Sequence, residues 1–365
     1  TSLIYSLWFM IYKDKAFLLY FAIIVKILYL RAIKDKNTPM KKRFTPYIII
    51  AVVAFAFGCS LPLLTSSTTF NSETESVKSE VPSLTAPPQV PTKVTFAGET
   101  IPLDRYDLRE RMDRELMAFT YMHSTTMLTI KKANRYLPII EPILRQQGVP
   151  DDLKYLAIIE SSLNTLAKSP AGAAGMWQFM QTTGRQYGLE VNNNIDERYN
   201  IEKATVAACK YLKEAYEKYG NWLSVAASYN AGQARITSEL SKQQAEKATD
   251  LWLVEETSRY MFRLLAAKEV FSNPQRFGFL LKREQLYPAM KYNEVTVTTG
   301  IDTLANFAKQ HGISYRELKD ANPWLRQDFL QNKSGRTYVL KIPTKESIYY
   351  NPKETKAHHL PWVID

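Results

Sequence analysis

The feature that most constrains the fold is a long stretch of helical periodicity from Leu103 to Phe277. Apolar residues recur there at spacings of three and four, most clearly in Arg105–Ala118, Ala204–Tyr219 and Trp252–Val270. This spacing puts apolar side chains on one stripe of each helix, and the stripe must be buried against other helices. The stretch predicts an all-α domain, which we place at residues 101–285.

The pattern changes after Pro288, where two segments alternate between apolar and polar residues. These segments, Glu294–Thr298 and Tyr338–Ile342, are typical of strands, and two short helical stretches lie between them. We therefore expect a small strand-helix-helix-strand module at residues 291–345, followed by a tail at 346–365. The predicted fold class is mainly α, with a helical domain and a small α+β module.

The second helix of this module has clear start and stop signals. Ser314 and Glu317 have the spacing of a capping box, in which each side chain bonds the backbone N–H of the other residue. The helix should end before Asn322, because the residue that precedes a proline disfavours the helical conformation.

The N-terminal part reads as an export signal and a tether. A basic start at Met40 precedes an apolar run, Tyr47–Phe57, that is short for a membrane span, and Gly58 and Cys59 follow. Residues 40–59 resemble a bacterial lipoprotein signal, which implies a lipid on Cys59, although the two residues before Gly58 depart from the usual pattern. Residues 60–100, rich in Ser, Thr and Pro, predict a tether. Residues 1–39 either precede the true start or, if translated, add a second span.

The charge and composition of the chain limit which classes of binding partner it can have. The formal net charge is +11 and the pI about 9.3, which favours an anionic partner such as a membrane surface, a nucleic acid or a cell-wall polymer. Nucleic acid is disfavoured because basic and acidic residues are interspersed. Two cysteines, Cys59 and Cys209, and four histidines offer little for a disulfide framework or a metal cluster. We expect no metal and no cofactor, and oligomeric state is not predicted.

Glu160 is the strongest candidate for chemistry. A helix that begins at Pro150-Asp151-Asp152 places it on the same face as Leu153, Leu156 and Ala157. Desolvation and the negative end of the helix dipole both disfavour the carboxylate, so its pKa should be raised. A raised pKa suits a general acid that works near neutral pH. The alternative is a structural Glu160 that is paired with a buried arginine.

Two further motifs follow this glutamate. One is a loop of small residues that begins at Ser169 and ends at Gly175-Met176-Trp177-Gln178, and the other is Ala227-Ser228-Tyr229-Asn230. Together with Glu160 they resemble, over residues 101–280, the lytic transglycosylases of the goose-lysozyme-like superfamily, especially the membrane-bound D-type members.

The resemblance implies a role for each matching residue. Glu160 corresponds to the catalytic glutamate and Ser169 to a serine that contacts the sugar N-acetyl group. Gln178 ends the Gly-Leu-Met-Gln motif, which differs here in its middle residues, and Tyr229 and Asn230 match the Ala-Tyr-Asn motif, with Ser228 in place of alanine. Tyr260, together with Glu256-Thr257, resembles an element that lines the substrate cleft.

The resemblance also implies a reaction. Glu160 would protonate the β-1,4 oxygen between N-acetylmuramic acid and N-acetylglucosamine of peptidoglycan and would then accept the proton of the muramyl C6 hydroxyl. The product would be a 1,6-anhydromuramyl end. No second carboxylate of the ordinary glycosidase pair lies within the three motifs.

The C-terminal module is similar to LysM domains, which bind peptidoglycan, across residues 293–343. The match includes Gly300-Ile301-Asp302-Thr303-Leu304, with Ile301 inserted, and Asn322-Pro323. If the module is a tethered binder, removing residues 291–365 should weaken binding to peptidoglycan sacculi and leave turnover of short glycans nearly intact. The alternative is a purely structural appendage.

Two other functions are compatible with these residues. A lysozyme-type hydrolase on the same fold would use a water-positioning acid such as Asp196 or Glu197. A noncatalytic wall-binding scaffold would instead contain a buried and paired Glu160. The predicted location is the bacterial cell envelope, facing the periplasm, with membrane attachment through the lipid or an N-terminal anchor.

Overall fold

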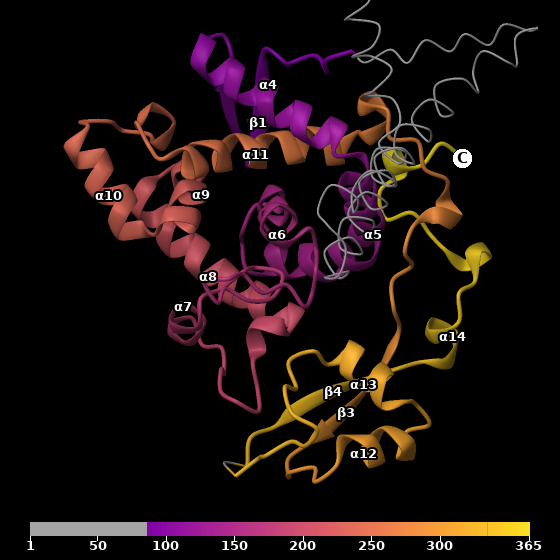
Figure 1. The fold of residues 1–365 in the computed structure, drawn as a ribbon. Helices are drawn as coiled ribbons and strands as arrows, with labels where there is room; N and C mark the ends of the chain where they lie inside the picture. Colours follow the sequence, from indigo (N-terminus) through magenta and orange to yellow (C-terminus); the bar gives the residue numbers. More distant parts are fainter. Residues whose placement is uncertain (1–85, 334) are drawn as a thin grey trace, which may run out of the picture. The chain divides into compact units, whose positions relative to one another are not determined.

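The computed structural model describes residues 86–333 and 335–365. Three predicted segments lie outside the described residues: residues 1–39, the predicted export signal at 40–59 with Cys59, and most of the range expected to be a tether. Within the described part, the molecule is mainly helical with a small strand-containing module, which confirms the predicted fold class (Figure 1). No helix in this part is long and apolar enough to cross a membrane.

The end of the range expected to be a tether is folded, which corrects that expectation. Strands β1 (Lys93–Phe96) and β2 (Glu99–Pro102) form an antiparallel hairpin. Val94 and Phe96 are buried and alternate with exposed residues, while Ala97 and Gly98 at the turn both have positive φ. A two-residue turn of this type matches the twist of a hairpin. The alternation is only four residues long, and the neighbouring Ser, Thr and Pro residues obscured it.

Eight helices form the helical domain. They are α4 (Tyr106–Tyr121), α5 (His123–Gln146), α6 (Lys154–Ser161), α7 (Gln181–Gln186), α8 (Ile201–Tyr219), α9 (Trp222–Ala231), α10 (Gln233–Lys242) and α11 (Glu255–Ser272). A 3-10 turn at Asp151–Leu153 precedes α6. Helix α11 packs against α4, α6 and α9. The last helix of the domain therefore contacts the first.

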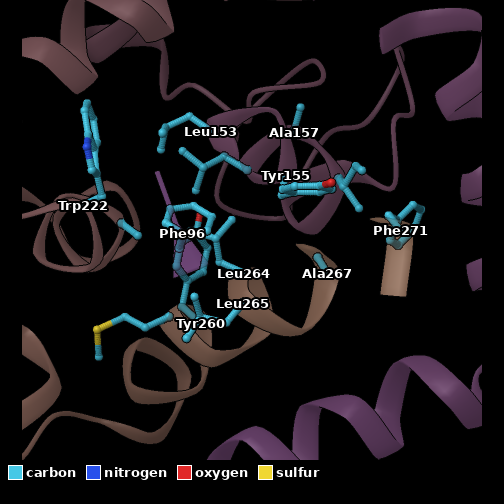
Figure 2. Close-up of a cluster of buried hydrophobic side chains, with 14 of the residues drawn as sticks. Phe96, Leu153, Tyr155, Ala157, Trp222, Tyr260, Leu264, Leu265, Ala267 and Phe271 are labelled. Carbon is cyan, nitrogen blue, oxygen red and sulfur yellow. The ribbon is translucent and has the colours of Figure 1, made fainter. Parts of the chain in front are cut away.

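The core of this domain brings the hairpin and three helices together (Figure 2). Phe96 of β1 is fully buried among side chains of α6 and α11, including Leu153 just before α6 and Leu264 of α11. Tyr260 of α11, which is 3% exposed, belongs to the same cluster. Burial of an aromatic ring of this size stabilises a fold by about 1.5–3 kcal/mol, so the hairpin is a structural part of the domain.

The C-terminal module has the predicted element order. Strands β3 (Tyr292–Val297) and β4 (Tyr338–Pro343) pair antiparallel around α12 (Leu304–Gln310) and α13 (Tyr315–Ala321). The capping box of α13 is present, since Ser314 Oγ accepts from the Glu317 N–H at 3.2 Å and Glu317 Oε2 accepts from the Ser314 N–H at 2.6 Å.

This module shares a core with the helical domain, contrary to the expectation of an independent binder. Buried Ile195 and Tyr199 from the segment between α7 and α8 join the apolar cluster of the module. Asn194, 8% exposed, donates from Nδ2 to the Phe329 carbonyl and accepts from the Gln331 N–H, both at 2.8 Å. A buried side chain with partners in both parts fixes them to each other.

The tail also returns to the helical domain, for which the sequence pattern gave no indication. After α14 (Lys345–Ile348) the chain reaches Trp362, which is 2% exposed. Its indole Nε1 donates to the Phe271 carbonyl at 2.6 Å. Ile364 N–H donates to the Leu281 carbonyl at 3.0 Å, so the tail ends beside the start of the linker to β3.

Candidate active site

Glu160 lies in the last turn of α6, where the backbone reverses sharply. Ser162 and Leu163 follow it with φ of +49° and +53°, a left-handed conformation that costs non-glycine residues roughly 1–3 kcal/mol each. Leu163 is 1% exposed, so burial of its side chain offsets part of that cost. The reversal ends the helix directly after the carboxylate.

The carboxyl group of Glu160 is enclosed by protein and keeps partial contact with solvent. The Tyr260 hydroxyl donates a hydrogen bond to Glu160 Oε1 at 2.5 Å. Burial raises the pKa of Glu160 to about 7, the Tyr260 hydrogen bond and the positive charge of Arg263 oppose that rise, and the charge of Glu256 adds to it. The raised pKa agrees with the pattern of the helix face.

No arginine or lysine pairs with Glu160 among the residues that the structure describes. Arg263 is near enough to act through its field but directs its Nε toward Glu115 Oε2, 3.5 Å away. Glu115 of α4 is 1% exposed and also accepts from Arg259 Nε at 2.6 Å. A scaffold role predicted a buried ion pair at Glu160. The structure instead has the buried ion pair at Glu115, a residue that the sequence patterns did not single out. Glu160 has no ionic partner among the described residues.

Tyr229 lies close to this carboxyl group, on α9. Burial, with the nearby Glu160 charge as a second cause, raises the pKa of Tyr229 well above its ordinary value. Its hydroxyl donates to the Trp177 carbonyl at 2.7 Å, and its ring meets that of Tyr211 edge-on at 5.2 Å. Tyr229 therefore fixes the loop motif against α9, while the next residue, Asn230, is half-buried at the end of the helix.

The loop between Ser169 and Gln178 is held by its own side chains. Ser169 Oγ accepts from the Ala173 N–H at 3.0 Å. Gln178, at φ +48°, donates from Nε2 to the carbonyls of Gly175 and Ala167 at 2.7 and 3.3 Å. Both residues keep partial access to solvent. The sugar contacts that the resemblance implies for Ser169 and Gln178 stay predictions.

Gly175 in this loop cannot be replaced without movement of the backbone. It has φ of +77°, and a Cβ atom there would lie 1.8 Å from the Arg198 carbonyl oxygen. Neighbouring Trp177 is fully buried and donates from Nε1 to Thr205 Oγ1 of α8 at 2.9 Å. The loop therefore packs directly on the segment that precedes α8.

The two acids proposed for a hydrolase are engaged elsewhere. Asp196 is buried and bonds Arg198 through both carboxylate oxygens, at 2.9 and 2.7 Å. Glu197 accepts from the Glu190 N–H at 2.8 Å and pairs with Lys203. Neither is among the charges that shift the pKa of Glu160. Glu256 is the acidic neighbour that does so.

Two protein-family models match parts of the described residues, one in the helical domain and one in the C-terminal module. Residues 138–252 match the Transglycosylase SLT domain, and residues 293–346 match the soluble lytic transglycosylase C-terminal LysM-like domain. The chain thus carries a transglycosylase-type domain followed by a LysM-like domain, as its motifs predicted.

Individual relatives are consistent with this class. Membrane-bound lytic murein transglycosylase D of Escherichia coli K12 is 31% identical over 66% of this chain and 52% of its own length. Peptidoglycan transglycosylase gp16 of Escherichia phage T7 is 32% identical over 38% of this chain and 11% of its own length. The chain therefore spans about half the length of the first of these relatives.

Among solved structures, the soluble lytic transglycosylase SLT70 of Escherichia coli has 23% identity to this chain. The match covers 37% of this chain and 24% of SLT70, with a TM-score of 0.33.

Proposed function

We propose that the protein is a peptidoglycan lytic transglycosylase that uses Glu160 as its single acid and base. The observation that carries this proposal is a protonatable, unpaired carboxyl group in contact with Tyr260, within a domain that matches the transglycosylase family. The relatives named as a lytic murein transglycosylase and a peptidoglycan transglycosylase support the same substrate.

The hydrogen bond between Tyr260 and Glu160 supports the following proton transfers in the proposed reaction. Tyr260 donates to Oε1 of Glu160, which leaves Oε2 to hold the transferable proton. Transfer to the oxygen between N-acetylmuramic acid and N-acetylglucosamine breaks the C1–O bond, and the muramyl acetamido group stabilises the positive charge at C1. The carboxylate formed on Glu160 then accepts the C6 hydroxyl proton as that oxygen bonds to C1. Attack within one sugar has a large proximity advantage over attack by water.

Glu160→Gln tests the assignment, because the amide keeps the shape of the side chain but cannot transfer the proton. We expect loss of 1,6-anhydromuramyl products by at least about ten-thousandfold, since both half-reactions fail. Mass spectrometry of products from purified peptidoglycan measures this loss. Anhydro products from the variant would refute the role of Glu160. Reducing ends from the parent protein would instead favour a hydrolase in which the Glu256 carboxylate accepts a proton from the attacking water.

The same substitution should stabilise the fold above neutral pH. A carboxyl whose pKa is raised on folding contributes its full stability below the unfolded pKa and loses it as pH rises through about 7. Gln at this position removes that loss, so the variant should gain on the order of 1–3 kcal/mol over the parent at pH 8 and little at pH 4. Urea denaturation at the two pH values measures the difference, and a scaffold role would give a loss of stability instead.

We further propose that the protein works in the cell envelope, attached to the membrane through a lipid on Cys59. Residues 40–59 support this, because a basic segment is followed by an apolar run and then by Gly58-Cys59. The similarity to a membrane-bound lytic murein transglycosylase also supports it. Fatty acid labelling of the chain expressed from Met40 should disappear in Cys59→Ser. An unlabelled parent protein would reject the proposed lipid on Cys59.

A further inference from the structure

A cleft of about 1150 Å³ separates α5 from two later segments of the chain. Its walls are α5 on one side and, on the other, the linker at residues 284–291 and the tail at residues 346–358. In Figure 1 the linker, in orange, and the tail, in yellow, both run between the helical domain and the C-terminal module. None of the motifs in the proposed active site contributes to this cleft.

The cleft is built by specific hydrogen bonds. Asn134 of α5, 2% exposed, donates from Nδ2 to the carbonyls of Tyr287 and Lys356, both at 3.0 Å. Lys291 N–H donates to Ser347 Oγ at 2.8 Å, which joins the linker to the tail at the far end. Because the buried Asn134 amide donates hydrogen bonds to both the linker and the tail, it fixes these two walls relative to α5.

Positive charge predominates on these walls. Five cationic side chains line the cleft, and none forms an ion pair among the described residues: Lys131, Arg135, Lys291, Lys353 and Lys356. Three carboxylates, those of Glu284, Glu346 and Glu354, also line it, so the cations exceed the carboxylates by two. Glu354 accepts from Asn351 at 2.7 Å. Hydrogen bonds from its own backbone and from Thr344, with the positive charges of Lys291 and Lys345, lower the pKa of Glu346. The walls therefore carry a net positive charge, which attracts an anionic ligand.

Aromatic rings lie between these cations. Tyr287 has the Arg135 guanidinium 5.3 Å from its ring centroid. Tyr349 and Tyr350 are 75% and 64% exposed, although large apolar rings are usually buried unless they serve recognition. The cationic side chains of the cleft can bind carboxylates of a ligand. The tyrosine rings can pack against the peptide backbone or sugar that carries those carboxylates.

We propose that this cleft binds the acidic stem peptide of peptidoglycan. This inference rests on the proposed function, because that substrate carries short peptides with several free carboxylates on its muramyl residues. A concave site with cations on facing walls suits a narrow chain, whereas an anionic membrane would require cations on one flat face. The cleft would then distinguish glycan strands that bear peptides from bare strands.

The test measures binding of a free tetrapeptide stem to the full chain by calorimetry, with the same peptide amidated at its carboxylates as the ligand control. Lys291→Glu combined with Lys356→Glu reverses two exposed cleft lysines. Lys93→Glu combined with Lys213→Glu makes the same charge change at exposed positions outside the cleft.

We expect the cleft variant to bind the acidic peptide about tenfold more weakly, because two exposed ion contacts become repulsions. The control variant and the parent should bind alike, and amidation or high salt should reproduce the loss in the parent. Equal binding by both variants would overturn the proposal, as would a loss seen only with phosphatidylglycerol vesicles. Cleavage of bare glycan is measured in parallel, since its absence in all proteins would count against the proposed function and not against the cleft.

Discussion

At the scale of single residues, the site depends on how the environment of one carboxyl group is balanced. Burial raises the pKa of Glu160 to about 7, while the Tyr260 hydrogen bond and the field of Arg263 keep it from rising further. A general acid is most effective when its pKa lies near the working pH. If Glu160 is the general acid that we propose, Tyr260 lowers the pH above which the enzyme loses activity.

Replacing Tyr260 with Phe should move that limit. Without the donated hydrogen bond the charged form of Glu160 is less stable, so its pKa rises and the decline of kcat/KM at alkaline pH shifts upward by about one unit. Tyr229→Phe is the matched control, because the Tyr229 hydroxyl donates to Trp177 and not to Glu160. Tyr229→Phe should lower kcat/KM but leave the pH of its alkaline decline unchanged. A pH–rate profile of each variant measures the shift, and an unchanged profile in Tyr260→Phe would contradict this account.

Features of the candidate site that depend on one helix face or one loop could be predicted from the sequence, because a local motif shows which residues lie together there. The helix face around Glu160 predicted a raised pKa correctly. Glu115 was not predicted, since it pairs with Arg259 and Arg263 across 144 and 148 positions of sequence. A spacing rule within one helix contains no information about such distant partners.

At the scale of elements, the loop between α6 and α7 is fixed by the segment before α8. Gly175 lies directly against the Arg198 carbonyl, and Arg198 NH1 donates to the carbonyls of Gly172 and Phe179 at 2.9 and 3.0 Å. The buried Asp196 and Arg198 pair therefore supports the loop that carries Ser169 and Gln178. The sequence showed a loop of small residues but not what holds it in place.

Gly175→Ala should be far more damaging than Gly172→Ala. Both glycines have positive φ, so each alanine costs about 1 kcal/mol in backbone strain. At Gly175 the added Cβ also collides with backbone at 1.8 Å, whereas at Gly172 nothing lies within 4 Å. We expect about 3 kcal/mol or more of lost unfolding free energy at Gly175 and about 1 kcal/mol at Gly172. Similar urea midpoints for the two variants would show that the loop accommodates the methyl group.

At the scale of the whole described molecule, the LysM-like module is packed on the helical domain. Ile195 and Tyr199 enter its core, and Trp362 of the tail is buried against Phe271. Periodicity predicted the module itself, because its strands and helices are local patterns. Its attachment depends on Asn194 and on a tail without periodicity, so it could not be predicted from local pattern.

The structure revises the expected effect of removing residues 291–365. The truncation exposes the faces around Tyr199 and Phe271, so turnover of short soluble glycans should fall together with binding to sacculi. Loss of Trp362 alone should cost about 3–5 kcal/mol, which Trp362→Ala in the full chain measures separately. Thermal unfolding and turnover of short glycans test this. A truncated protein as stable and active as the full chain would restore the view of an independent binder.

The return of the tail has a consequence for how the protein unfolds. The chain leaves the helical domain at Leu281 and returns to the same place at Ile364. The LysM-like module therefore lies between two segments that are hydrogen-bonded to each other. Arg283 N–H donates to Asp365 Oδ1 at 2.9 Å and adds to this closure. Release of the tail would expose Trp362, and separation of the module would expose Ile195 and Tyr199, so each part is stabilised by contact with the other. The two domains should therefore melt in a single cooperative transition.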